Sequence, residues 1–198
     1  MDLAVVGKAI GMFAVTNVDD VVVLTVFFGQ ARGRAGALRV VAGQYLGFGA
    51  ILATSVVGAA GAGLLPESAV AYLGLLPIVL GLRAAWRVWS QGPSGASEEV
   101  TPGPSSVGVL AVATVTFANG GDNIGVYLPV FATTNAVGVV TYCAVFLVMV
   151  GLWCAAGRFL ATRRPIAQAL SRWGHIVLPV VLVGIGLLIL IEGGAFGL

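Results

Sequence analysis

Charged residues are scarce in this sequence. Only 9% of its 198 residues are Asp, Glu, Lys or Arg, and 59% are hydrophobic, whereas ordinary soluble domains carry about 25% charged residues. So few charges cannot cover the surface of a water-soluble protein of this size, which excludes a soluble globular domain. Glycine is abundant, with 29 residues, as is typical of closely packed membrane helices. The composition therefore predicts an integral membrane protein.

Residue types that build several familiar sites are also few. The chain has one histidine, His175, and two cysteines, Cys143 and Cys154, without a Cys-x-x-Cys pattern. Neither a disulfide framework nor a thiolate metal motif is indicated, and the roles of these three residues stay open. A phosphate-binding Gly-x-x-x-x-Gly-Lys-Ser/Thr motif, an HExxH motif and a serine–histidine protease pattern are missing, which disfavours ATP hydrolysis and an intramembrane enzyme. The net charge of +2 gives no indication of a nucleic-acid partner.

Six stretches are long and apolar enough to cross a bilayer as helices, which takes about 20 mostly apolar residues. They are Leu3–Phe28, Val40–Leu65, Ala69–Trp89, Val107–Val130, Val137–Gly157 and His175–Ile191. We therefore predict an all-α membrane protein with six transmembrane helices in a single transmembrane domain, residues 1–198. Residues 90–106, rich in Pro, Gly and Ser, are predicted to form a flexible linker between residues 1–89 and residues 107–198.

Positive residues concentrate on one side of the predicted membrane. Nine of the ten Lys and Arg residues lie in or beside the first, third and fifth loops, and only Lys8 lies on the other side. Cytoplasmic loops carry the excess of positive residues. The linker is therefore predicted to be cytoplasmic and both termini to lie outside.

The two halves resemble each other. Each half is predicted to cross the bilayer three times, and because three is an odd number, the two halves must run through the bilayer in opposite directions. The first span of each half contains an amide-rich, acidic interruption, Phe13–Asp20 and Phe117–Asn123, and the two align when Asp19 is set over Asp122. Inverted repeats with interrupted helices are a recurring design of transporters. We therefore predict two inverted three-helix repeats.

Three aspartates lie inside apolar spans, where each carboxylate costs about 2.5–3.5 kcal/mol on insertion scales. No Lys or Arg in the core of either span offsets their charge, so a cation, a proton or a water-filled cavity is expected beside them. Spacings of three and four residues put polar neighbours on the same helical faces, and Gly120–Gly121 could free backbone carbonyls as further ligands. The candidate binding residues are Thr16, Asn17, Asp19, Asp20, Thr116, Asn119, Asp122 and Asn123.

These oxygen-bearing groups together suit a divalent metal ion. For the two threonines, hydrogen bonding to neighbouring helices is an equally good interpretation. Gln44 and Tyr45 lie beside Gly43-x-x-x-Gly47, a spacing that indicates a close contact between helices. Either residue could instead line the path of a transported substrate.

The two interruptions carry a family resemblance. Thr16–Asp20 followed by Leu24 and Phe27–Phe28, with Asn119–Asn123 and Pro129 in the second half, resembles the cadmium-resistance transporter family of the lysine-exporter superfamily. The resemblance implies export of a divalent heavy metal, cadmium first, across the bacterial inner (plasma) membrane. It implies metal-binding roles for Asp19, Asp20, Asp122, Asn119, Asn123 and Asn17.

Several points stay open from the sequence. Oxygen ligands alone suit manganese, calcium or magnesium, whereas soft ligands suit cadmium. Export of basic amino acids or other small organic cations, paired with the carboxylates through an ammonium group, is the alternative function. Carboxylate ligands lose protons when they bind metal, so exchange of metal for protons is a hypothesis. No resident cofactor is expected, and the oligomeric state, a homo-oligomer included, is undetermined.

Overall fold

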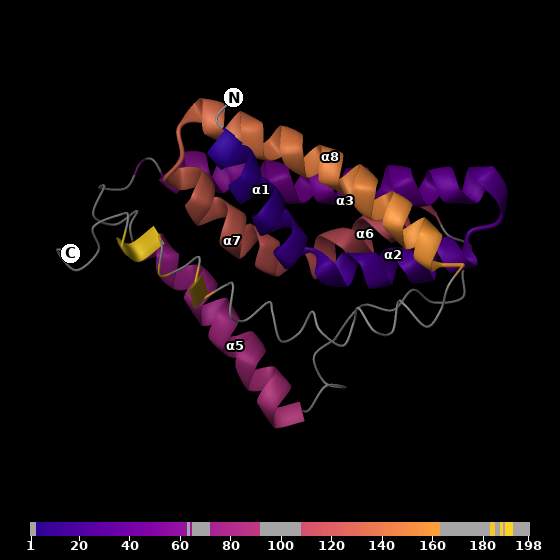
Figure 1. Ribbon diagram of the computed structural model, residues 1–198, viewed down its shortest axis with the longest axis horizontal. Helices are drawn as coiled ribbons and strands as arrows, with labels where there is room; N and C mark the ends of the chain where they lie inside the picture. The colour runs from indigo at the N-terminus through magenta and orange to yellow at the C-terminus, as the bar shows by residue number, and fades with distance from the viewer. Residues whose placement is uncertain are drawn as a thin grey trace.

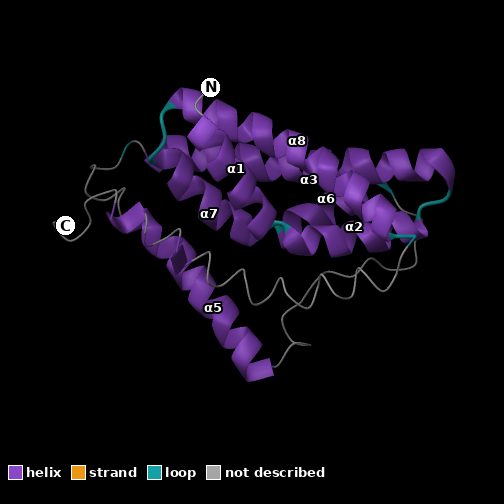
Figure 2. Cartoon of the chain, viewed as in Figure 1, coloured by secondary structure: helices purple, strands orange, loops and turns teal. Residues whose placement is uncertain are grey.

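A computed structural model describes residues 3–62, 64, 72–91 and 108–162, and positions 183, 184, 187 and 189–191. Every element in this part of the chain is a helix (Figures 1 and 2), so the all-α prediction is confirmed there. Most of the predicted sixth span, His175–Ile191, and most of the linker 90–106 lie outside the described residues.

The first predicted span is a pair of helices bent by 59°. Helix α1 covers Leu3–Thr16, α2 covers Val18–Gln30, and Asn17 stands between them (Figure 1). Polar side chains at the junction bond the preceding turn: Thr16 Oγ1 donates to the Met12 carbonyl at 2.9 Å, and Asn17 Nδ2 approaches the Phe13 carbonyl at 2.9 Å. Such bonds compete with regular helical geometry. The predicted interruption of this span is therefore present.

The predicted span Val107–Val130 also falls on two helices, α6 at Val109–Asn119 and α7 at Gly121–Ala132. Gly120 stands between them, and a β-carbon at this position would collide with the side chain of Ile51 on the long helix α3, Gly33–Ala62. The junction thus lies directly against α3.

Two helices are unbroken and long enough to cross a membrane, α3 and α8, which covers Ala136–Leu160. The described residues contain these two candidate spans, or three when the bent pair α1–α2 is taken as one. Helix α5, Leu75–Gln91, follows a 3-10 turn at Tyr72–Gly74 and is shorter than the predicted span Ala69–Trp89. The chain is accordingly a membrane protein of apolar helices.

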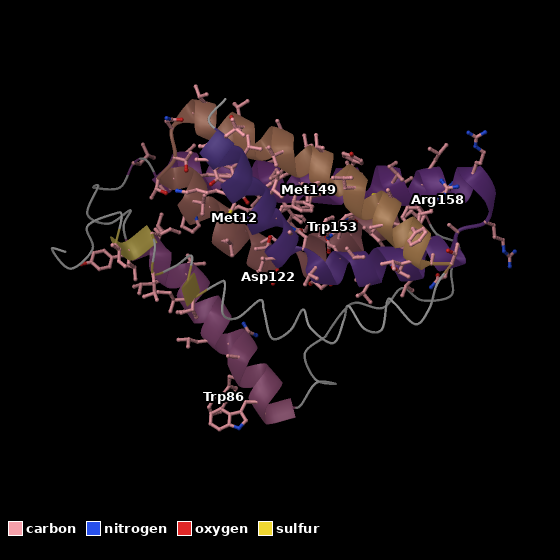
Figure 3. The ribbon with its side chains drawn as sticks, viewed as in Figure 1. Met12, Trp86, Asp122, Met149, Trp153 and Arg158 are labelled. Carbon is pink, nitrogen blue, oxygen red and sulfur yellow. The ribbon has the colours of Figure 1, made fainter. Side chains whose placement is uncertain are left out.

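Helix α3 begins at Gly33 and not near Val40, where its apolar run starts, so Arg34 and Arg39 are helical. Both arginines are exposed. Their long side chains can cover apolar surface while the charged guanidinium groups stay in water, which lets them lie on an otherwise apolar helix. Arg158 of α8 lies at the same end of the bundle, where α2 ends and α3 begins (Figure 3).

The broken helices pack mainly on the long helix of the other half. α1 and α2 run along α8, whereas α6 and α7 run along α3 (Figure 1). Four fully buried rings from four helices meet between them: Phe13, Phe48, Tyr127 and Phe146. The ring centroids of Phe13 and Phe48 are 5.4 Å apart, and those of Tyr127 and Phe146 are 4.8 Å apart. This aromatic core lies beside the break at Asn17.

Candidate functional site

Each helix break places acidic residues in the first turn of the helix that follows. Asp19 and Asp20 lie in the first turn of α2, and Asp122 lies in the first turn of α7. A helix N-terminus has unpaired N–H groups and partial positive charge, which stabilise a carboxylate by roughly 0.3–1 kcal/mol and by up to about 2 kcal/mol when it is partly buried. Asp122 Oδ1 accepts a bond of 3.0 Å from the Asn123 backbone N–H. The breaks therefore offset part of the cost of placing these charges in an apolar span.

One hydrogen-bond network joins the two breaks directly. The amide nitrogen of Asn17 lies 2.7 Å from the Tyr127 hydroxyl and 2.9 Å from the Thr16 hydroxyl, and the two hydroxyls are 2.9 Å apart. Asn123 Nδ2 donates to Asn17 Oδ1 at 2.9 Å. All four side chains are buried. We call Thr16, Asn17, Asn123 and Tyr127 the junction network, because they link the α1–α2 break to α7.

Helix α8 supplies a further contact to the junction. The indole N–H of Trp153, labelled in Figure 3, donates to the Asn17 backbone carbonyl at 2.6 Å. At the second break, the Gly120 carbonyl still accepts the Ile124 N–H at 3.3 Å. Both of these carbonyls accept a hydrogen bond within the protein.

A second network connects three helices around Asp20. Gln44 of α3 donates from Nε2 to Asp20 Oδ2 at 3.0 Å, and Thr116 of α6 donates to Gln44 Oε1 at 2.6 Å. Asp20, Gln44 and Thr116 are 6%, 3% and 2% exposed. We call these three residues the Gln44 bridge. It connects the buried carboxylate of Asp20, just after the first break, through α3 to helix α6, which ends at the second break.

Two buried polar atoms of the described residues have no hydrogen-bond partner, Asn119 Nδ2 and Asn123 Oδ1. They flank the break at Gly120. A buried polar atom without a partner costs about 1–3 kcal/mol, and rotation of an amide exchanges its oxygen and nitrogen. Both asparagines can therefore present an oxygen to a ligand.

The three aspartates do not form one cluster. Across residues 3–62, 72–91 and 108–162, no group of three or more His, Cys, Asp or Glu side chains is placed to hold a metal ion. Asp19 and Asp122 are half-buried, and Asp20 is buried. The sequence-predicted residues are instead linked through amides and hydroxyls, in the junction network and in the Gln44 bridge.

A family model of cadmium resistance transporters matches residues 13–198. The chain belongs to the cadmium resistance transporter family. No curated protein and no solved structure matches it. The match includes both breaks, so the resemblance noted in the two interruptions is confirmed. This family is one of transporters and not of enzymes.

The donors found at the breaks of this cadmium resistance transporter carry oxygen and nitrogen. Cys143 is half-buried and Cys154 is buried, and both are free thiols. Neither belongs to a group of three acidic, histidine or cysteine donors in the described ranges. The side chains gathered at the breaks thus form a hard donor set for a cation that prefers softer ligands.

Sequence reasoning overlooked Tyr127 and Trp153. Tyr127 follows Asn123 by four residues, so it shares the helical face that carries the asparagine. Trp153 lies in an apolar helix, where a buried indole N–H generally finds an acceptor. These two signals identify polar contacts but not their partners, because the partners lie on other helices.

Proposed function

We propose that this member of the cadmium resistance transporter family exports divalent heavy-metal cations, cadmium first, from the cytoplasm across the bacterial plasma membrane. The cation would pass the two helix breaks. The observation that carries the proposal is the bond between Asn17 and Asn123, 2.9 Å long, which joins two breaks that are each followed by acidic residues. A cation at this junction would reach carboxylates of both halves of the chain.

The helix boundaries support two related halves. The register that sets Asp19 over Asp122 also sets Thr16, the end of α1, over Asn119, the end of α6. It further sets the start of α3 at Gly33 over the start of α8 at Ala136. One register thus relates a broken helix and a long helix in each half. This agreement favours two inverted repeats, with six spans in all.

The packing of the halves suits alternating access. Each broken helix lies on the long helix of the other half, so a movement of one half against the other shifts both breaks together. Interrupted helices that meet at a repeat interface form the substrate sites of many secondary transporters. We infer that the junction network opens when the cation passes.

The metal ligands in this proposal are Asp19, Asp20, Asp122, Asn119 and Asn123. The unpartnered Asn123 Oδ1 is an acceptor already directed into the protein interior. Asn17 and Thr16 hold the junction through Tyr127 and would contribute oxygen only after these bonds rearrange. Carboxylates that bind metal release protons, so export is proposed to exchange metal for protons.

The arginines support the proposed orientation. Arg34 and Arg39 lie in the first two turns of α3, which begins at the end of the bundle where Arg158 of α8 lies (Figure 3). Positive residues favour the cytoplasmic side. That end is therefore proposed to face the cytoplasm, with both termini outside.

Transport into everted membrane vesicles tests this function. Cadmium, zinc, manganese, calcium and lysine are supplied in parallel, and uptake is compared for the parent and the variants Asp19→Asn, Asp20→Asn and Asp122→Asn. Cadmium uptake that each aspartate variant strongly reduces supports the proposal. Glu98→Gln, which removes a carboxylate from the linker 90–106, is the matched control and is expected to transport like the parent.

The same assay separates the alternatives. Uptake of lysine without uptake of any metal would assign the carboxylates to an organic cation. Metal uptake that persists after collapse of the pH gradient would rule out proton exchange while leaving metal export in place.

A further inference from the structure

Gln44 lies where helices α3 and α6 are in close contact. It lies in α3 between Gly43 and Gly47. A β-carbon on Gly43 would lie 2.5 Å from Val112 Cβ, and one on Gly47 would lie 2.6 Å from the Ala113 carbonyl oxygen. The two glycines therefore bring the α3 backbone against α6, which allows the Gln44 side chain to reach Thr116.

The bonds of the Gln44 bridge have one direction. The Thr116 hydroxyl donates to Gln44 Oε1 at 2.6 Å, so the amide nitrogen must face the other way, toward Asp20 Oδ2 at 3.0 Å. A rotated amide would put its oxygen against the carboxylate, which only accepts hydrogen bonds, and would lose the bond to Asp20. Bonds in such a chain polarise one another in a low-dielectric interior. The carboxylate thus sets the direction of the amide, and the bond from Thr116 holds the amide that contacts the carboxylate.

We propose that Gln44 is a positioning residue of the transport site, which orients the Asp20 carboxylate for the passing cation. Thr116 acts through Gln44, to which its hydroxyl donates. This inference rests on the proposed function, in which Asp20 binds the metal. Partners that orient a ligating carboxylate typically contribute 10–100-fold to metal affinity.

Cadmium binding to the purified full chain in detergent, measured by titration calorimetry, tests the role. Gln44→Leu is expected to weaken cadmium affinity by about 10–100-fold. Thr116→Val is expected to weaken it by a smaller factor, and Thr116→Ser, which retains the hydroxyl, should bind like the parent. The double variant should bind no more weakly than Gln44→Leu alone, because Thr116 acts only through Gln44.

Tyr45→Phe is the matched control on the same helix. It removes a bond of similar length, 3.0 Å from the Tyr45 hydroxyl to the Leu147 carbonyl, outside the Gln44 bridge. Its cadmium affinity should equal that of the parent. The thermal midpoint of every variant is recorded, so that a loss of fold is separated from a loss of affinity.

Three results would overturn the inference. They are parent-like affinity in Gln44→Leu, equal losses in Thr116→Val and Thr116→Ser, and additive losses in the double variant. The Thr116 pair keeps the test valid if Gln44→Leu does not fold. Parent-like cadmium binding by Asp20→Asn would instead remove the proposed role of Asp20, whereas loss of binding in Asp20→Asn with parent-like Gln44→Leu would overturn the positioning role alone.

Discussion

The contact between α3 and α6 makes a strong prediction about Gly47→Ala. The added methyl group would lie 2.6 Å from the Ala113 carbonyl oxygen and 2.7 Å from Thr116 Cβ. The first of these is a backbone atom, which cannot move aside without shifting α6. Gly49 is two residues further along the same helix, and a β-carbon there meets nothing within 4 Å. Gly49→Ala is therefore the matched control.

The magnitude follows from the difference between the two variants. Both replace a helical glycine with alanine, which favours the helix by about 0.8–1 kcal/mol in each case, so this gain cancels. Overpacking of a well-packed interface costs about 1–3 kcal/mol. The free energy of unfolding of Gly47→Ala should thus be lower than that of Gly49→Ala by about 1–3 kcal/mol.

Reversible unfolding in lipid bicelles, followed by helix content, measures this difference. Cadmium binding is measured on the same samples, because separation of α3 from α6 would lengthen the bond between Thr116 and Gln44. Gly47→Ala should bind cadmium more weakly, and Gly49→Ala should bind like the parent. Equal stability of the two variants would refute the close approach of α3 and α6.

Three further substitutions test individual contacts by the same unfolding measurement. Tyr127→Phe removes the hydroxyl that bonds Thr16 and Asn17 and should cost about 0.6–1.7 kcal/mol, as interhelical hydrogen bonds in membranes do; stability equal to the parent would argue against the junction network. Trp153→Phe leaves the Asn17 carbonyl without its 2.6 Å indole donor and should be destabilising by about 1–3 kcal/mol, and a neutral result would contradict this contact. Asn135→Ala removes the side chain that caps α8 by accepting the Gly138 N–H at 2.8 Å. We expect a stability loss of about 1 kcal/mol and cadmium transport like that of the parent. A transport defect without a loss of stability would contradict a purely structural role of this cap.

The helix breaks could be predicted from the sequence because their cause is local. Thr16 and Asn17 bond carbonyls in the turn before them, and glycine, which stands at position 120, is a poor helix former. The alignment of Asp19 with Asp122 likewise anticipates the matching starts of α3 and α8. These features depend on residue type and spacing, which a sequence contains in full.

The contacts between helices could not be predicted in the same way. The pattern put Thr116 on the face of the aspartates, but its bond goes to Gln44 on another helix. Tyr127 and Trp153 carry apolar bodies with one polar atom, so they read as core residues until their partners are known. Among the described residues the three carboxylates do not form one cluster, and the contacts at the breaks run through amides and hydroxyls, because the positions of the helices decide which side chains meet.

The ligand shell of the bound cation tests the central claim most directly. X-ray absorption at the cadmium edge, on the purified protein loaded with one equivalent of cadmium, distinguishes oxygen from sulfur neighbours. Our account predicts a shell of oxygen or nitrogen that is lost or strongly altered in Asp20→Asn and unchanged when Cys143 and Cys154 are replaced by alanine. A shell dominated by sulfur, retained in Asp20→Asn and lost with the cysteines, would contradict a transport site at the helix breaks.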